Sequence, residues 1–460
     1  MKALFCALCA ILAGCAVAPP PLFVEKPYLQ LGDNPKASAL KLLWQAATND
    51  GQWTVEVAED GQFRKIAQSP TALPIRVKGT PLHFVYSATL SGLKPGSTFA
   101  YRVSLNGTVV FEATGKARPG ADAPYKFVVF GDSGADTPAQ KEIAVLAHKL
   151  DPSMVFVTGD IVYTRGLISE YRTKYFPIYN ADTASPNVGA PLTRSTVMLA
   201  APGNHDVASR DLNKHPDGLA YFFYWSMPLN GVDMPMFSKL EGDADRVRDF
   251  TNIAGANFPR MLNYSFEWGN SHWLVLDSNN YVDWSNTEFQ EWIAADLAAS
   301  NAMWKFVSFH HPGFNSSKAH FKDQQVRLFA PIFEKYGVDV VFNGHVHNYQ
   351  RTYPMRFVPG ETFDLAKSKE VDGTWKLDRA FDGVSETKPQ GVIYLVTGAG
   401  GSTLYNPDQG DDPKSWQEFT VKFVSKIHSL TDVEVTGKSA VFRQYDKNGA
   451  IIDQFLLTKP

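Results

Sequence analysis

Residues 127–132 read Phe-Val-Val-Phe-Gly-Asp, and residues 154–160 read Met-Val-Phe-Val-Thr-Gly-Asp. Each segment begins as a short apolar run typical of a buried strand and ends in a Gly-Asp pair. Between them, residues 138–149 carry apolar side chains at helical spacing. A strand, a helix and a second strand in this order predict a βαβ unit with parallel neighbouring strands. We therefore expect Asp132 and Asp160 to lie side by side at the carboxyl ends of these strands.

The same pattern of an apolar run followed by a polar side chain recurs further along the chain. Apolar runs at 197–201, 304–309 and 338–342 precede Asn204, His310 and His345. Amphipathic segments at 287–299 and 324–336 supply helices between strands, and a late strand is expected at 392–396. Ligands of open α/β sheets bind beyond the carboxyl ends of the strands, where residues far apart in sequence converge. The pattern therefore predicts an α/β domain with a site built from strand ends.

Length and composition are those of an ordinary globular protein with more than one core. A chain of 460 residues exceeds what one core usually supports, so two domains or one large decorated domain are expected. The formal net charge is -3 and no basic run occurs, so we expect no nucleic-acid partner.

The first residues are typical of an export signal. Lys2 precedes an apolar run from Ala3 to Leu12, which is too short to span a bilayer. Residues 12–15 read Leu-Ala-Gly-Cys and resemble a bacterial lipobox, which implies cleavage before Cys15 and lipid attachment there. Residues 1–21 are thus interpreted as a lipoprotein signal peptide and a proline-rich tether, and the protein as exported and anchored to the bacterial cell envelope. The alternative is an ordinary signal in which the cysteine is incidental.

Residues 22–120 predict an all-β sandwich. Short runs rich in β-branched and aromatic residues alternate with turn-forming residues, and five strands are expected at 40–44, 53–57, 83–88, 99–103 and 109–111. Residues 93–103 resemble the penultimate strands of a fibronectin type III domain. Such a domain serves either as a scaffold packed on the catalytic domain or as a binding module. Residues 118–124 read as a linker to the second domain, 121–460.

The polar residues after the strands form two overlapping sets of candidate metal ligands. Hard cations prefer oxygen donors, imidazole suits zinc and iron, and a carboxylate can bridge two ions. One set is Asp132, Asp160, Tyr163 and His347; the other is Asp160, Asn204, His310 and His345. With Tyr163 as phenolate, a bridging hydroxide and a trivalent plus a divalent ion, the site keeps a charge of about +1, which attracts phosphate. This favours phosphate ester cleavage by a hydroxide bound to the metal pair.

As a series, these motifs resemble the calcineurin-like metallophosphoesterases, and specifically the purple acid phosphatases. The distinguishing residue is Tyr163, three residues after the shared Asp160, and residues 344–354 and the N-terminal sandwich also look like that family. The resemblance implies a four-layer αββα domain, a ferric ion (Fe3+) in the set with Tyr163, and Zn2+, Fe2+ or Mn2+ in the other. It further implies that His205 contacts phosphate and that His320 positions the substrate or protonates the leaving group.

Several residues depart from the family pattern. Asp206 stands where the family usually has glutamate, one methylene longer, which could weaken a contact that supports a ligand. The plant relatives have paired histidines near His320, whereas its neighbour here is Ala319, so general-acid capacity rests on His320 alone or on His205. The cysteine that links plant subunits is absent, which leaves the oligomeric state open. The polar segment 356–390 is interpreted either as part of the substrate entrance or as a solvated loop, and a phosphate contact by Arg351 stays undecided.

The sequence therefore predicts a secreted, lipid-anchored acid phosphatase that hydrolyses small phosphate monoesters. One alternative keeps the site but changes the substrate to diesters, nucleotides or phospholipid headgroups. Another alternative is a surface-displayed binding lipoprotein with an inactive phosphatase domain. Retention of the complete set of candidate ligands argues against an inactive phosphatase domain.

Overall fold

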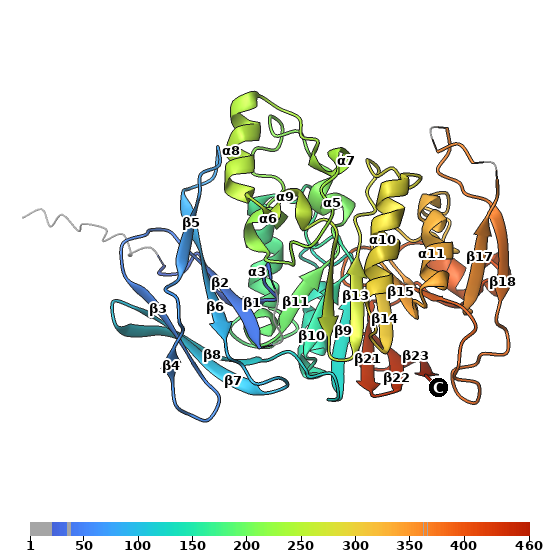
Figure 1. Cartoon of the computed structure of the whole chain (residues 1–460), viewed down its shortest axis with the longest axis horizontal. Coiled ribbons are helices and arrows are strands. Elements are labelled where there is room, and N and C mark those ends of the chain that lie inside the picture. The colour runs from blue at the N-terminus through green and yellow to red at the C-terminus, as the bar shows by residue number, and fades with distance from the viewer. Residues whose placement is uncertain (1–20, 35–37, 362, 366) are drawn as a thin grey trace, which may run out of the picture.

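The computed structural model describes residues 21–34, 38–361, 363–365 and 367–460 (Figure 1). The expected signal segment and its Cys15 lie outside these residues. The described part begins with an antiparallel β-sandwich and continues into a mixed α/β domain. Within the described residues, no helix has both the length and the apolar character that crossing a bilayer requires.

The sandwich consists of two four-stranded sheets with the orders β1-β2-β6-β5 and β4-β3-β7-β8. Its strands are β1 (Glu25–Gln30), β2 (Ala39–Ala46), β3 (Trp53–Ala58), β4 (Arg64–Lys65), β5 (Thr71–Ile75), β6 (His83–Ser91), β7 (Thr98–Leu105) and β8 (Thr108–Lys116). Trp44 stacks on Tyr86 and contacts Trp53 between the sheets. The five expected strands are confirmed as β2, β3, β6, β7 and β8.

Two sheets packed face to face form the centre of the α/β domain. The first, of order β11-β10-β9-β21-β22-β23, contains β9 (Tyr125–Phe130), β10 (Met154–Val157), β11 (Val197–Ala200), β21 (Ser429–Thr436), β22 (Ser439–Asp446) and β23 (Ile451–Thr458). The second, of order β12-β13-β14-β15-β19-β16-β20, contains β12 (Tyr264–Trp268), β13 (Ser271–Val275), β14 (Trp304–Ser308), β15 (Val340–Asn343), β16 (Tyr349–Thr352), β19 (Ile393–Thr397) and β20 (Thr420–Val424). The ring of Phe127 lies 5.1 Å from that of Trp273 and 5.5 Å from that of Phe306, which places the aromatic core between the sheets.

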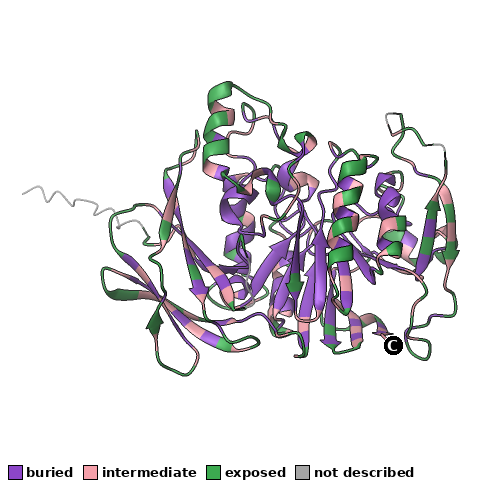
Figure 2. Ribbon diagram, in the orientation of Figure 1, coloured by how far each residue is buried: buried purple, intermediate pink, exposed green. Residues whose placement is uncertain are grey.

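Helices cover the outer faces of both sheets, so the domain has the four layers that were expected. On the first sheet lie α1 (Pro138–Lys149), α3 (Phe176–Tyr179) and α4 (Leu192–Ser195), and on the second α10 (Thr287–Ala299) and α11 (Ala330–Lys335). The remaining helical segments are α2 (Ile168–Glu170), η1 (Tyr171–Tyr175), α5 (Asn204–Val207), α6 (Tyr221–Tyr224), α7 (Pro235–Ser238), α8 (Ala244–Ala254), α9 (Asn257–Arg260), η2 (Gln325–Phe329), η3 (Pro407–Asp411) and η4 (Pro413–Ser415). Figure 2 shows the sheets as the most buried part of the molecule, with exposed residues concentrated on outer helices and hairpins.

The parallel strands are arranged as the βαβ prediction requires. β9 pairs with β10, and β10 with β11, both in parallel; β13, β14, β15 and β19 form a parallel run in the second sheet. The carboxyl ends of β9, β10, β11, β14 and β15 therefore lead into the five segments that carry the candidate ligands.

Two segments differ from expectation in detail. The helix expected at 324–336 is a 3-10 turn, η2, followed by the short α11. The polar segment 356–390 contains a β-hairpin of β17 (Met355–Pro359) and β18 (Gly373–Leu377). Lys369, which lies in the sequence between these two strands, lines the candidate site.

The sandwich is joined to the α/β domain by hydrogen bonds from its first sheet. The Tyr28 hydroxyl donates to the Tyr224 carbonyl at 2.8 Å, and the Tyr224 hydroxyl lies 2.9 Å from Nε2 of His83. The side-chain oxygen of Gln30 accepts from the amide of Ser226 at 3.0 Å. These contacts support the interpretation of the sandwich as a packed scaffold.

Candidate metal centre

Three of the candidate ligands have left-handed backbone conformations where their strands end. The φ angles are +57° at Asp132, +52° at Asp160 and +65° at His345. Residues other than glycine rarely adopt this conformation, which aspartate, asparagine and histidine tolerate better than most. Each of the three follows a glycine directly, so the chain turns sharply and its side chain projects beyond the sheet edge. Such strained positions cluster at functional sites.

Glycine allows the loops to approach one another closely. A Cβ built on Gly203 would collide with the backbone nitrogen and the carboxylate of Asp160. A Cβ on Gly159 would lie 2.5 Å from Nδ1 of His310. These positions explain why glycine precedes the polar residue in the loops after β10 and β11.

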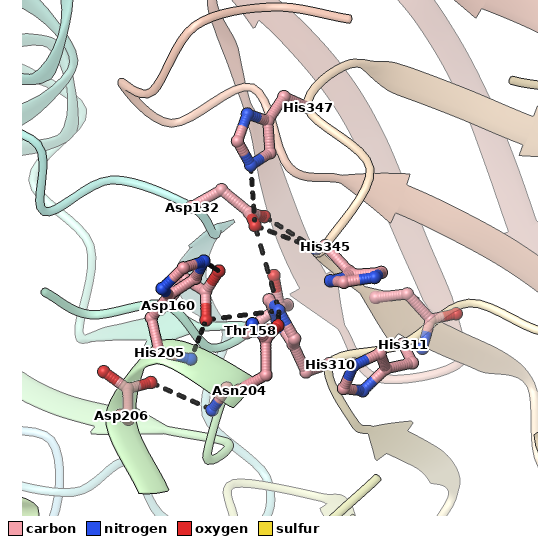
Figure 3. A network of polar contacts seen from close by, with 12 residues as sticks. Asp132, Thr158, Asp160, Asn204, His205, Asp206, His310, His311, His345 and His347 are labelled. Carbon is pink, nitrogen blue, oxygen red and sulfur yellow. Dashed lines mark hydrogen bonds and ion pairs between the residues drawn. The ribbon is translucent and has the colours of Figure 1, made fainter. Parts of the chain in front are cut away.

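The first candidate set comes together around Asp132. Its Oδ1 lies 3.3 Å from the Tyr163 hydroxyl and 3.4 Å from Nε2 of His347, while Tyr163 and His347 are 3.1 Å apart. Possible ligand atoms of Asp132, Asp160 and His347 all lie within 4.8 Å of one another, and the three residues are buried. Figure 3 shows Asp132 between His347 and the backbone of His345, whose amide donates to both carboxylate oxygens.

The second set surrounds His310. Its Nε2 lies 3.1 Å from Oδ1 of Asn204 and 3.3 Å from Oδ1 of Asp160. The ring of His345 lies 5.0 Å from the ring of His310, centre to centre. Asp160 therefore reaches both sets, which is the arrangement that a shared carboxylate requires. Figure 3 shows the side chains of Asp132, Asp160, Asn204, His310, His345 and His347 in one network. Tyr163 contacts Asp132 and His347 in the same network.

Backbone carbonyls fix which nitrogen of each ring faces the centre. Nδ1 of His310 lies 2.8 Å from the carbonyl of Thr158, and Nδ1 of His347 lies 2.7 Å from the carbonyl of Thr403. A carbonyl only accepts, so each Nδ1 carries hydrogen and donates to it. In the neutral rings, Nε2 then presents a lone pair toward the carboxylates.

This donor set fits two cations. When both rings are neutral, the lone pairs of two ring nitrogens, two carboxylates and the Asn204 amide oxygen face one another across a buried space. Acceptors that face acceptors repel unless a positive charge lies between them, and a metal ion supplies that charge in place of a ring proton. Oxygen and imidazole ligands of this kind suit zinc, iron and manganese. Carbonyl-oriented histidines are a frequent feature of such sites.

The protonation of the buried groups reflects the same crowding of negative charge. Burial raises the pKa of the Tyr163 phenol well above its usual range, and the charges of Asp160 and Asp132 raise it further. Burial lowers and the Asp160 carboxylate raises the pKa of the His310 imidazole, with a net value of about 9. A cation at the centre would act in the opposite direction on both groups.

Asp206 holds the backbone of two ligand loops together. Its carboxylate accepts from the amide of Ile161 at 3.0 Å and from the amide of Gly203 at 2.9 Å. Burial and the neighbouring Asp160 charge raise the pKa of Asp206. The aspartate, although one methylene shorter than the usual glutamate, thus reaches both the loop that follows Asp160 and the loop that precedes Asn204.

The two histidines expected to act on the substrate line a cleft of about 760 Å³ next to the centre. Nε2 of His205 lies 3.8 Å from Oδ2 of Asp160, and its ring packs 4.5 Å from that of Tyr163. The ring of His320 lies 4.0 Å from that of His345, and its Nδ1 is 3.3 Å from Oδ2 of Asp323. His205 therefore adjoins the shared carboxylate, and His320 adjoins His345 and Asp323.

Arg351 lies away from the cleft. It is buried, its guanidinium donates to both carboxylate oxygens of Asp453 at 2.7 and 3.0 Å, and it lies over the ring of Phe455. Both partners belong to the C-terminal strand β23. Arg351 therefore fastens β16 to β23, and the question of a phosphate contact is answered in favour of a structural ion pair.

Four ionisable residues that line the same cleft were not predicted from the sequence: Arg165, His311, Asp323 and Lys369. His311 follows a predicted ligand directly, and its ring lies 4.2 Å from that of His345. Asp323 follows His320 by three residues, a spacing that could have indicated their contact. No local signal marks Lys369, because the hairpin β17-β18 delivers it from a distant segment.

A model of the calcineurin-like phosphoesterase family matches residues 125–349, the range that contains every candidate ligand. Purple acid phosphatase 23 of Arabidopsis thaliana is 24% identical over 360 residues, which cover 72% of this chain and 65% of the relative. Probable inactive purple acid phosphatase 27 of the same plant is 25% identical over 81% of this chain and 58% of its own length. The chain thus spans less than two thirds of the length of these curated relatives.

Among solved structures, purple acid phosphatase PPD1 from yellow lupin (Lupinus luteus) seeds superimposes with a TM-score of 0.66 at 18% identity, covering 94% of this chain and 74% of the lupin chain. This similarity concerns the fold. The family model implies a binuclear metal site and a phosphoester substrate. The α/β domain is therefore that of a calcineurin-like metallophosphoesterase, and the chain resembles the purple acid phosphatases and has an N-terminal β-sandwich domain.

Proposed function

We propose that the protein is an acid phosphatase that hydrolyses small phosphate monoesters with two bound metal ions. Asp132, Asp160, Tyr163 and His347 would hold a ferric ion, and Asp160, Asn204, His310 and His345 would hold zinc, manganese or ferrous iron. The observation that carries the proposal is the position of Asp160, whose carboxylate lies within reach of His310 on one side and of Asp132 and His347 on the other.

The bound pair would supply Lewis acidity, which lowers the pKa of a water molecule and neutralises charge on phosphate oxygens. The protein provides the geometry: the carbonyls of Thr158 and Thr403 hold two rings in the orientation that directs Nε2 inward. The other candidate ligands lie in loops at the strand ends, where the loop backbone positions their short side chains.

His205 is suited to hold the phosphate beside the shared carboxylate. Its Nδ1 lies 2.9 Å from the Thr164 carbonyl, which keeps Nε2 turned toward Asp160 and the cleft. His320 is suited to donate a proton to the departing alcohol, because it lines the cleft beside His345 and its Nδ1 faces Asp323.

The alternative of an inactive binding lipoprotein has a named precedent in the relative called probable inactive purple acid phosphatase 27. Against it stands the convergence of possible ligand atoms from five candidate residues: Asp132, Asp160, Asn204, His310 and His347. An idle site would be under no constraint to keep mutually repelling buried acceptors in place.

The decisive experiment combines metal analysis with turnover. The purified protein should contain two metal equivalents and hydrolyse 4-nitrophenyl phosphate at mildly acid pH faster than bis(4-nitrophenyl) phosphate. Asp160→Asn should lose most of the bound metal and at least a thousandfold in kcat, because it removes the charge shared by both ions. Metal-free wild-type protein with unchanged turnover would reject the mechanism, and a faster diester reaction would favour a phosphodiesterase.

A further inference from the structure

Lys369 lies at the substrate cleft although it belongs to the polar segment that follows the ligand motifs. It lines the same cavity as His205 and His320. It stands in the connection between β17 and β18, the hairpin at the edge of the molecule in Figure 1.

Buried hydrogen bonds fix the backbone around Lys369. Its carbonyl accepts from the amide of Gln324 at 3.1 Å, and the amide of Val371 donates to the Gln324 side chain at 3.1 Å. Arg327, which is also buried, donates to the carbonyl of Val371 at 3.0 Å. The position of Lys369 at the cleft is therefore part of the fold and does not depend on the Lys369 side chain.

The ammonium group of Lys369 shares a carboxylate with the cleft histidine. Nζ lies 2.9 Å from Oδ1 of Asp323, while Oδ2 of Asp323 faces Nδ1 of His320 at 3.3 Å. An ammonium has three N–H donors, and the Lys369 side chain is 52% exposed. Donors remain available for an anion in the cleft next to His320.

Arg165 adds a second cation. It follows Tyr163 closely, and its amide donates to Oε2 of Glu170 at 2.9 Å, which fixes its backbone. Among the residues that the structure describes, its guanidinium has no hydrogen bond or ion pair, and it lines the same cleft. The cleft walls thus carry two full positive charges and the single carboxylate of Asp323.

We propose that this cleft selects phosphate esters whose alcohol portion carries a second anionic group, which Lys369 and Arg165 bind. The proposal rests on the proposed function, because the cleft becomes a leaving-group site only if the ester phosphorus lies at the metal centre. An alcohol that leaves toward His320 passes beside Lys369, so a carboxylate or phosphate on it pairs with that ammonium. Lys369 and Arg165 are then specificity-determining residues.

The test uses two substrates of the same shape, 4-carboxyphenyl phosphate and 4-carbamoylphenyl phosphate, with phosphate release as the readout. Wild-type protein should show a higher kcat/KM for the carboxylate. Lys369→Gln and Arg165→Gln should each reduce that preference about fivefold, the size of a partly exposed ion pair, mainly through KM. Lys369→Arg keeps the charge and should retain most of the preference.

Lys322→Gln is the matched control. Lys322 is 78% exposed and pairs with Glu370 at 3.4 Å, but it does not line the cleft. Its removal changes the net charge equally and should leave the preference unchanged.

Two results would overturn the proposal. One is an equal kcat/KM of wild-type protein for both substrates; the other is an equal loss on both substrates in Lys369→Gln, which would mean that Lys369 only positions Asp323 and His320. Absence of turnover on either ester would instead count against the proposed function, so the two failures are distinguishable.

Discussion

Tyr163 is the residue that distinguishes this site from a centre built only of carboxylates, an amide and imidazoles. Its hydroxyl lies within 3.3 Å of Asp132 and 3.1 Å of His347, and its ring packs on His205. The phenol is buried beside two carboxylates, and burial is the main reason why its pKa is raised. Only a strong local positive charge would make phenolate the stable form in this surrounding.

Replacing Tyr163 by Phe tests that assignment. The ring and its packing on His205 are kept, while the oxygen that would bind ferric iron is lost. The visible absorption of an iron-loaded sample should disappear, and far-UV circular dichroism should be unchanged. A variant with the same visible spectrum as wild-type protein would reject the phenolate ligand.

Gly203 offers a second test at the level of one residue. In Gly203→Ala the new methyl group would be forced against the backbone and carboxylate of Asp160. Overpacking of this kind costs about 1–3 kcal/mol, and here the strain falls on the shared ligand. We expect lower metal content together with reduced thermal stability, measured by metal analysis and calorimetry.

Gly120→Ala is the control for this prediction. A Cβ at Gly120 meets one atom, the Cβ of Pro95 at 3.8 Å, which is ordinary contact. If both variants lost the same amount of metal, the close approach of the loops would not be the cause.

At the scale of elements, the strands before the ligands were predictable because each is a short apolar run that ends in polar residues. Two sandwich strands that escaped prediction, β1 and β5, share a physical reason. β1 contains Pro27 and β5 contains Pro74, and both strands lie at edges of their sheet. Proline has no backbone N–H, which a strand in the interior of a sheet needs for hydrogen bonding, so a segment with proline is not predicted as a strand. An edge strand tolerates proline because one of its sides forms no hydrogen bonds with a neighbouring strand.

Proline also explains the helix that was expected to be continuous from 324 to 336. Pro331 has no N–H to donate, and its ring would clash with the carbonyl one turn earlier, so an α-helix cannot run through it. The chain therefore forms the 3-10 turn η2 and begins α11 at Ala330, with the proline in the first turn.

The positions of the candidate ligands could be predicted because they lie at strand ends, whereas the contacts of the surrounding cleft residues could not. A strand end can be recognised in sequence, and parallel neighbours bring such ends together. The pairing of Asp323 with Lys369 depends on a hairpin that joins residues 46 positions apart. Nothing local in the sequence encodes that approach.

His272 fastens α10 to the second sheet and makes their contact dependent on pH. Its ring nitrogens lie 2.8 Å from Glu267 and 2.8 Å from Asp296, the latter in α10. Burial lowers its pKa, but the hydrogen bonds with Asp296 and Glu267 prevail and raise the pKa to about 9. Because the folded value exceeds the unfolded one, this stabilisation is complete below pH 6.5 and is lost as pH rises through about 9.

His272→Gln should therefore cost more stability at pH 6 than at pH 10, by about 2–3 kcal/mol. Urea unfolding of both proteins at the two pH values measures the difference. Asp296→Asn should show a pH dependence of the same sign, because it removes one of the two acceptors. A cost that is the same at both pH values would contradict the assigned ion pairs.

At the scale of the whole molecule, the sandwich and the α/β domain were both predicted. Near residue 120 the sequence pattern changes from closely spaced strands to alternating strands and helices. Their mutual packing was not predictable, since it depends on side chains such as Tyr28 and Tyr224 that meet across the interface. The linker residue Arg118 is itself buried and donates to the carbonyl of Glu267. The two domains are therefore joined both by contacts of the sandwich strands and by the linker itself.

We also propose export and attachment to the cell envelope through a lipid on Cys15, on the sequence of residues 1–21 alone. A lipid chain on this cysteine would supply membrane affinity that the folded part need not provide. In a bacterium that processes lipoproteins, the full chain should sediment with membranes, and Cys15→Ser should shift most of it to the soluble fraction. The same distribution for both proteins, measured by immunoblotting of the fractions, would reject the anchor.

The left-handed backbone at Asp132, Asp160 and His345 has an evolutionary consequence. Glycine and asparagine relieve or tolerate this conformation at least as well as the residues present, so exchanging a ligand for either removes chemistry while leaving the turn intact. The fold and the catalytic activity can therefore be lost independently in evolution. A descendant protein could lose turnover through one substitution and keep the fold for another function.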